Sequence, residues 1–257
     1  MSGKWIWYEL LTNDVAGAID FYTKVVGWKM SASHQPDMDY QMWQVGDDPM
    51  DCIGGVMQQP EPMAKSGAPP MWLGYIQVDD VDAACAAIET DGGKKWMEMT
   101  IPNVGRFATV NDPQHAALYV MQPEGTGESK AFAVGKVGHI GWNEYHGKDG
   151  EAALGFYAKH FGWTADEPYD MGPMGKYHLF SIDGQQSGGI MTDSTFPNPV
   201  WMFYFNVEDI AAAKSRVETA GGTVMHGPHE VPGGQMILVA KDPQGGLFGL
   251  LTAPKST

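Results

Sequence analysis

Two glutamates, Glu9 and Glu144, are the first candidates for chemistry, because each follows a tryptophan by two positions. The tryptophans are Trp7, in the stretch WYE, and Trp142, in the stretch WNE. Side chains two residues apart on a strand point to the same face, so each glutamate is expected beside its tryptophan. A carboxylate in a cavity could act as a general base or as a ligand of a divalent cation. It could equally tie down a neighbouring backbone NH, arginine or lysine, and the sequence leaves these roles open.

Histidines are the second set of candidates, and they concentrate in the C-terminal half. His139 lies three residues before Trp142, so a regular strand would point it to the opposite face unless a bulge intervenes. His226 and His229 lie in the stretch HGPHEVPGG, which is expected to be a loop and gives a weak metal-binding signal. Six of the chain's eight histidines belong to this half: His139, His146, His160, His178, His226 and His229.

These residues recur because the chain repeats itself. Residues 7–28 and 142–163 are related by an offset of 135, and nine of these 22 positions are identical. The similarity continues downstream, where IGGVM is matched by SGGIM, and VNDPQHAALYVM by AKDPQGGLFGLL. A repeat over nearly the whole chain indicates a gene duplication. It predicts one domain over residues 1–122, a polar, glycine-containing linker over 123–136, and a second domain over 137–257.

Each half has the local signals of a mixed α and β structure. A short aromatic-rich strand is followed by Asp14 or Asp149, which can cap a helix, and by apolar residues spaced as on one helix face. Gly27 and Gly162 fall where a left-handed helix end is expected. The order predicted for each half is β-α-β-β-β-α-β-β. In the first half it has later strands near 40–45, 53–57, 71–78, 105–110 and 116–121, and a helix over 80–90.

A strand, a DxxxAxxFYxxxxGW helix, a GG-containing hairpin and a late Asp-Pro turn together resemble the vicinal oxygen chelate superfamily. Glyoxalase I, bleomycin-resistance proteins and extradiol dioxygenases belong to it. The resemblance covers both halves and implies an α+β fold, in which tandem βαβββ modules form curved, incomplete barrels with a ligand on the concave face. It also implies a divalent cation, acting as a Lewis acid, in most enzymes of the superfamily.

The positions implied for metal ligands do not carry them here. Seven residues before each helix-capping aspartate lie Trp7 and Trp142, where the superfamily usually has a first-strand ligand. Seven residues after the aspartate of each Asp-Pro turn lie Tyr119 and Gly249, where it usually has glutamate. No metal site and no other cofactor are therefore predicted. The alternative is a displaced site for Fe, Ni, Mn or Zn that uses Glu9, Glu144 or His139.

An aromatic-lined cavity is the expectation that replaces the metal. Such walls favour a flat, aromatic or apolar ligand held by stacking, as in the bleomycin-resistance type of protein. Arg106 adds a cation in a chain that has few, although a surface ion pair would also explain it. The predicted ligand-binding residues are Trp7, Trp142, Trp72, Trp201, Tyr119, Phe107, Met236 and Arg106. Glu9 and Glu144 are the predicted catalytic residues if the chain is an enzyme.

The sequence leaves three functions open. The first is a binding protein for a small molecule, and the second is a metal-dependent, glyoxalase-like lyase, isomerase or dioxygenase. The third is a protein whose paired domains serve oligomer assembly, for example as a homodimer. The net charge of −15 argues against nucleic acid and against anionic membranes as partners. No 18-residue apolar run and no signal-peptide core occur, so a cytoplasmic protein is expected. The two cysteines show no metal-binding or disulfide spacing.

Overall fold

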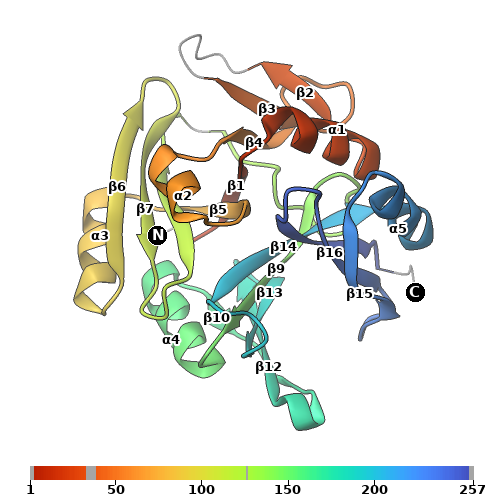
Figure 1. The fold of residues 1–257 in the computed structure, drawn as a ribbon. Helices are drawn as coiled ribbons and strands as arrows, with labels where there is room; N and C mark the ends of the chain where they lie inside the picture. The colour runs from red at the N-terminus through yellow and green to blue at the C-terminus, as the bar shows by residue number, and fades with distance from the viewer. Residues whose placement is uncertain (1–2, 33–38, 126, 255–257) are drawn as a thin grey trace. The chain divides into compact units, whose positions relative to one another are not determined.

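The first half of the chain forms two successive βαβββ modules in the computed structural model, which describes residues 3–32, 39–125 and 127–254 (Figure 1). Its elements are β1 (Trp5–Thr12), α1 (Val15–Val25), β2 (Lys29–Ala32), β3 (Tyr40–Gln44), β4 (Cys52–Gln58), α2 (Glu61–Ser66), β5 (Met71–Gln77), α3 (Val81–Thr90), β6 (Lys94–Ile101), β7 (Gly105–Asn111) and β8 (Ala117–Pro123).

The second half repeats this order with small additions. Its elements are β9 (Ile140–Gly147), α4 (Gly150–Phe161), β10 (Thr164–Ala165), β11 (Tyr169–Asp170), the short helix η1 (Gly172–Met174), β12 (Lys176–Ile182), β13 (Gln185–Thr192), β14 (Val200–Val207), α5 (Ile210–Thr219), β15 (Thr223–Glu230), β16 (Met236–Lys241) and β17 (Leu247–Thr252).

Each half contributes one mixed sheet. The strand orders are β2-β3-β4-β1-β5-β8-β7-β6 and β10-β12-β13-β9-β14-β17-β16-β15, with β11 paired to β12. Within the modules, β1 runs parallel to β4, and β5 parallel to β8. The predicted α+β class with tandem βαβββ modules is confirmed. Among the described residues, no helix is long and apolar enough to cross a bilayer.

The predicted order missed two strands and one helix of the first half. β6 (Lys94–Ile101) is exposed along most of its length, so it lacks the alternation by which a strand is found in sequence. β2 has four residues, and α2 is a single six-residue helix that buries none of them. The strands predicted near 53–57, 71–78, 105–110 and 116–121 are present as β4, β5, β7 and β8.

The loop predicted at HGPHEVPGG is wrong for its first part. Both His226 and His229 lie in β15, which pairs with β16 through register shifts on either side of His226. Glycine and proline in this stretch suggested a loop, but they lie within an irregular strand, as bulges on edge strands often require. His226 is exposed and His229 is half-buried.

The helix signals were correct. The Asp14 carboxylate accepts a hydrogen bond from the Gly17 backbone NH at 2.9 Å, and Asp149 accepts one from Ala152 at 2.9 Å. Gly162 ends α4 in the left-handed conformation, with φ of 71°. The buried face of α1 is the predicted one: Ala18, Phe21, Tyr22 and Val25.

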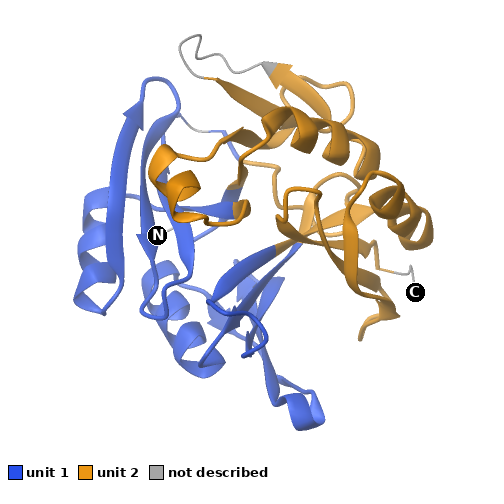
Figure 2. Ribbon diagram, viewed as in Figure 1, with its two compact units in different colours: residues 1–6, 73–128, 142–202 blue, residues 7–72, 129–141, 203–257 orange. Residues whose placement is uncertain are grey.

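Two compact units divide the chain, and neither coincides with a half (Figure 2). Unit 1 combines the second module of the first half with the first module of the second half, and unit 2 combines the remaining two modules. Unit 1 comprises Met1–Ile6, Leu73–Glu128 and Trp142–Met202; unit 2 comprises Trp7–Trp72, Ser129–Gly141 and Phe203–Thr257. The domain boundaries at 1–122 and 137–257 stay a prediction about the sequence repeat.

A buried aspartate joins the two modules of unit 1. Asp112, in the Asp-Pro turn between β7 and β8, accepts backbone hydrogen bonds from Gln114 and Ala116. Its other oxygen accepts the hydroxyl hydrogens of Tyr145 at 2.7 Å and Tyr157 at 3.1 Å, both from the second half. Burial raises the pKa of Asp112, although the tyrosine and backbone donors oppose this shift.

Unit 2 repeats this junction with one tyrosine fewer. Asp242, in the equivalent turn, accepts the hydroxyl hydrogen of Tyr22 at 3.0 Å, and Trp72 Nε1 donates to the same hydroxyl at 2.9 Å. Leu10 stands at the position equivalent to Tyr145. Asp242 therefore receives one phenolic hydrogen bond where Asp112 receives two.

This difference predicts that a tyrosine-to-phenylalanine substitution lowers the unfolding free energy by different amounts in the two units. Tyr22→Phe leaves both Asp242 and the Trp72 indole NH without their buried partner, and we expect a loss of about 3 kcal/mol in unfolding free energy. Tyr157→Phe leaves Trp201 unpaired, but Asp112 retains Tyr145, so we expect a loss of about 1.5 kcal/mol. Urea unfolding followed by tryptophan fluorescence measures both. Equal losses, or a larger loss for Tyr157→Phe, would contradict the account.

Candidate functional site

The tryptophans at the implied metal-ligand positions donate hydrogen bonds to tyrosines. In unit 2, Trp7 Nε1 donates to the Tyr40 hydroxyl at 2.7 Å. In unit 1, Trp142 Nε1 donates to the Tyr177 hydroxyl at 2.7 Å, and Tyr177 donates to Glu144 Oε2 at 2.6 Å. We call Trp7 and Tyr40 the first pair, and Trp142, Tyr177 and Glu144 the second relay.

The double glycines of IGGVM and SGGIM make room for these tyrosines. Glu144 lies opposite Gly189 in the β9–β13 ladder, and a Cβ on Gly189 would lie 2.3 Å from the Tyr177 hydroxyl oxygen. In unit 2, a Cβ on Gly55 would lie 2.1 Å from the Tyr40 hydroxyl oxygen. Any larger residue would push the tyrosine away. The same arrangement, a glycine pair that leaves space for a tyrosine bonded to a tryptophan, therefore occurs in both halves.

A histidine and an aspartate extend the second relay. His146 Nε2 lies 2.9 Å from Glu144 Oε1, and His146 Nδ1 lies 2.9 Å from Asp193 Oδ2. Asp193 is held in turn by the backbone NH and the hydroxyl of Thr195, both at 2.7 Å. The sequence analysis named His146 only among the histidines of the C-terminal half, and it did not predict Asp193 or Tyr177 as site residues. Alternation along β9 was the signal for His146, since residues 142, 144 and 146 share a face.

The charges of this cluster follow from its geometry. Both ring nitrogens of His146 face carboxylates, so both can donate only if the ring is protonated. Burial lowers the pKa of His146, but Glu144 and Asp193 outweigh burial, and the pKa is raised above its ordinary value. Burial and the Glu144 charge raise the pKa of Tyr177 far above its ordinary value, so its phenol stays protonated. The two carboxylates therefore favour the protonated form of the His146 ring.

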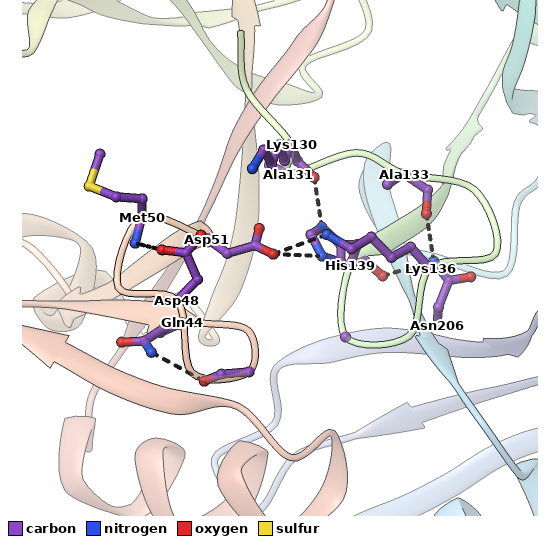
Figure 3. Close-up of polar contacts among 12 residues, drawn as sticks. Gln44, Asp48, Met50, Asp51, Lys130, Ala131, Ala133, Lys136, His139 and Asn206 are labelled. Carbon is purple, nitrogen blue, oxygen red and sulfur yellow. Dashed lines mark hydrogen bonds and ion pairs between the residues drawn. The ribbon is translucent and has the colours of Figure 1, made fainter. Parts of the chain in front are cut away.

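His139 belongs to unit 2 and lies at the end of the stretch between the repeats (Figure 3). It is fully buried in unit 2, with Nδ1 2.7 Å from the Lys130 carbonyl oxygen. Its Nε2 lies 3.6 Å from Asp51 Oδ2, and that carboxylate also pairs with Lys136 at 3.0 Å. Burial lowers the pKa of His139, and the neighbouring Lys136 adds to the effect. This surrounding suits a neutral core histidine.

An aromatic and methionine-rich face lies on β5 to β8 in unit 1. Tyr75 stacks on Tyr119 with centroids 4.1 Å apart, and Phe107 meets both rings edge-on at 5.7 and 5.8 Å. Met97 and Met99 are opposite Thr109 and Phe107 in the β6–β7 ladder, and they remain 41% and 42% exposed. Methionine adapts to irregular apolar partners, so these side chains extend the predicted wall of Phe107 and Tyr119.

Other predicted ligand-binding residues lie elsewhere. Trp72 and Trp201 are buried in the cores, where their indoles donate to Tyr22 and Tyr157. Arg106 pairs with Asp82 at 2.6 Å and with Glu98 at 3.4 Å, which is the surface ion pair considered above. Met236 is half-buried at the start of β16, and Glu9 is buried on β1 opposite Gly55.

The residues present do not fit the family's divalent cation. No group of three or more histidine, cysteine, aspartate or glutamate side chains is arranged to hold a metal within the ranges that the structure describes. In the second relay, each ring nitrogen of His146 already faces a carboxylate at 2.9 Å, so neither nitrogen is directed at a metal position. At His139 the only carboxylate described nearby, that of Asp51, is already paired with Lys136.

Two hollows lie along helices rather than on these strands. One, of 410 Å³, belongs to unit 1 and runs beside α3 and the end of α4. The other, of 430 Å³, belongs to unit 2 and lies beside Lys24 of α1 and Arg216 of α5. None of the predicted site residues lines either hollow.

Comparison with known sequences gives matches over most of the chain. Residues 5–120 and 136–250 match the Glyoxalase/Bleomycin resistance protein/Dioxygenase superfamily. "Putative glyoxylase CFP32" of Mycobacterium bovis is 30% identical over 250 residues, covering 95% of this chain and 93% of that protein. "Anthracycline biosynthesis protein DnrV" of Streptomyces peucetius is 29% identical over 260 residues, covering 95% of this chain and 91% of that protein.

Solved structures share the fold at low sequence identity. The Mn(II)-bound glyoxalase from Novosphingobium aromaticivorans superposes with a TM-score of 0.69 at 14% identity, covering 99% of this chain and 83% of that one. The dioxygenase LapB from Pseudomonas sp. KL28 gives a TM-score of 0.67 at 11% identity, covering 98% and 94%. At these identities the similarity shows the fold alone.

The raised pKa of His146 predicts a pH-dependent stability. A histidine whose folded pKa exceeds its unfolded value stabilises fully below the unfolded pKa, about 6.5, and this contribution is lost as pH rises through the folded pKa. We therefore expect the unfolding free energy of the wild type to exceed that of His146→Gln most strongly below about pH 6.5, with a smaller difference at higher pH.

His160 is the matched control, because burial lowers its pKa although Asp91 lies 2.8 Å from its Nε2. A lowered folded-state pKa reverses the direction in which this contribution to the unfolding free energy changes with pH. Its contribution is present above the unfolded pKa and is lost as pH falls through the folded pKa. Urea unfolding of the wild type, His146→Gln and His160→Gln across this pH range measures both trends. The account of the cluster fails if the two variants follow the same trend.

Proposed function

The chain belongs to the Glyoxalase/Bleomycin resistance protein/Dioxygenase superfamily, and from that premise we propose that it binds a small, flat, aromatic or apolar molecule without the family's usual metal. The ligand is held by stacking on aromatic and methionine side chains, with a few polar groups that orient it. Binding, rather than a Lewis-acid reaction, is the activity that these side chains support.

One observation carries this proposal. The position at which the superfamily resemblance implies a first-strand ligand is tryptophan in both halves, and each indole NH is already donated to a tyrosine hydroxyl. Tyr119, where the resemblance implies a glutamate, stacks on Tyr75. A hard or borderline cation finds no ligand in these side chains, whereas a planar apolar molecule finds partners for its faces and edges.

The relatives add support of a coarser kind. DnrV and DauV of Streptomyces are named for anthracycline biosynthesis, and anthracyclines contain fused planar rings. That a small molecule is the partner, that nucleic acid and membranes are not, and that the protein acts in the cytoplasm all stay predictions. Assembly as a homodimer also stays a prediction.

A metal-dependent lyase, isomerase or dioxygenase is the second candidate, favoured by the relative named as a glyoxylase. It would need Glu9, Glu144 or His139 as displaced ligands. Glu144 is bonded through both oxygens, to Tyr177 and to His146, and His139 faces a carboxylate that Lys136 already pairs. We therefore rank this candidate below binding.

Alizarin, a planar dihydroxyanthraquinone, is a suitable probe for the proposal. Isothermal titration of the full chain with alizarin, at a pH low enough to keep its phenols protonated, is expected to show saturable binding. Trp142→Ala removes stacking area and the relay's donor, so we expect affinity to fall at least about tenfold, equivalent to 1.4 kcal/mol.

The control variant is Trp96→Ala, which removes an indole that is 62% exposed on β6 and leaves the second relay intact. It should bind alizarin as the wild type does. Absence of saturable binding by the wild type, or equal losses in the two variants, would sink the proposal.

A further inference from the structure

The first pair and the second relay differ in the residues that follow them in sequence. The second relay has His146 and Asp193 behind it, and the equivalent residues of the first half are Leu11 and Gln59. Leu11 is buried, and the Gln59 side chain donates to the Ala68 and Pro69 carbonyl oxygens rather than to a histidine. The duplication therefore produced one copy with an ionisable pair behind the glutamate and one without it.

The added pair holds Glu144 in place. His146 bridges Glu144 and Asp193 at 2.9 Å on each side, and the Phe196 ring lies 4.9 Å from the imidazole. The His146 and Asp193 side chains are 8% and 12% exposed, so water competes weakly for these bonds. Charge-assisted hydrogen bonds of this kind are about twice as strong as neutral ones. Both oxygens of Glu144 are therefore bonded, and its carboxylate has a fixed orientation.

The net charge of this cluster sets what can lie beside it. Two carboxylates outnumber the single histidine, so the cluster is negatively charged even with His146 protonated, next to the Trp142 and Tyr177 rings. Among the described residues, the titratable groups that contact His146 are Glu144 on the same strand and Asp193 after β13. Tyr177 on β12 donates to Glu144, and the raised pKa of this phenol keeps it neutral. An anionic group placed here meets repulsion that a partly buried site screens little.

We propose that His146 and Asp193 are positioning residues that make the second relay a specificity site, which accepts aromatic ligands carrying a neutral or cationic hydrogen-bond donor and rejects anionic ones. This inference rests on the proposed function, because it names the class of ligand that the aromatic site takes. The first pair has Leu11 and Gln59 in place of His146 and Asp193, so it does not carry this pair of residues and does not set this preference.

A series of naphthalene probes that differ in charge tests the inference. Naphthol, naphthoate and naphthylmethylammonium offer the same ring with a neutral donor, an anion and a cation. With the full wild-type chain at pH 7.5, we expect naphthol and naphthylmethylammonium to bind at least about tenfold more tightly than naphthoate in isothermal titration.

Variants of the cluster change the selectivity in opposite directions. Asp193→Asn and Glu144→Gln neutralise the cluster, so the preference for naphthol over naphthoate should fall to about threefold or less. His146→Leu, which restores the residue of the first half, removes the positive charge and should increase that preference. Structural damage alone would weaken all three probes together, so the ratio of affinities separates positioning from folding.

Glu151→Gln is the matched control, because it removes one negative charge from the exposed first turn of α4 and leaves the hydrogen bonds of the cluster in place. Its selectivity should equal that of the wild type. Wild-type binding of all three probes with equal affinity, or an equal change of selectivity in Glu151→Gln and Asp193→Asn, overturns the inference and leaves the proposed function standing. Failure of every probe and of alizarin to bind overturns both.

Discussion

The buried bonds between tyrosines and the aspartates of the Asp-Pro turns are the constraint on which the structure depends most. Asp112 and Asp242 each lie in one half of the sequence and accept hydroxyl hydrogens from the other half. Leaving a buried carboxylate unpaired is costly, so each turn needs its tyrosine partner. These bonds join modules from different halves of the sequence within one unit. The same tyrosines hold Trp72 and Trp201 in the cores.

With the helices held by these bonds, the opposite faces of the first strands are available for the relay. Tyr145 lies on the face of β9 that packs in the core, and Trp142 and Glu144 point to the opposite face of the strand. The double glycine of β13 then admits the Tyr177 ring against the backbone. Each part is needed for the next, which explains why a tryptophan, a glutamate and a glycine pair recur together in both halves.

The sequence predicted the fold well, because the helix caps, the apolar faces and the repeat are local signals. It predicted the site less completely. Trp142 and Glu144 were found from their spacing, but their bonds run through Tyr177 and Asp193, which lie 33 and 47 residues away from Glu144 and His146 respectively. Trp72 and Trp201 were predicted on a cavity wall. The sequence pattern of an aromatic residue on a strand is the same whether its side chain faces a ligand or packs against a helix. Only long-range packing separates these cases.

One titration tests the central claim, that an aromatic ligand rather than a divalent cation occupies the relay positions. Nitrogen-labelled tryptophan gives one indole NH signal per side chain, and those of Trp7 and Trp142 can be assigned by substitution. Alizarin is expected to shift both signals, while equimolar Mn(II), which is paramagnetic, leaves them sharp. Broadening of these two signals by equimolar Mn(II), with no response to alizarin, would contradict the account.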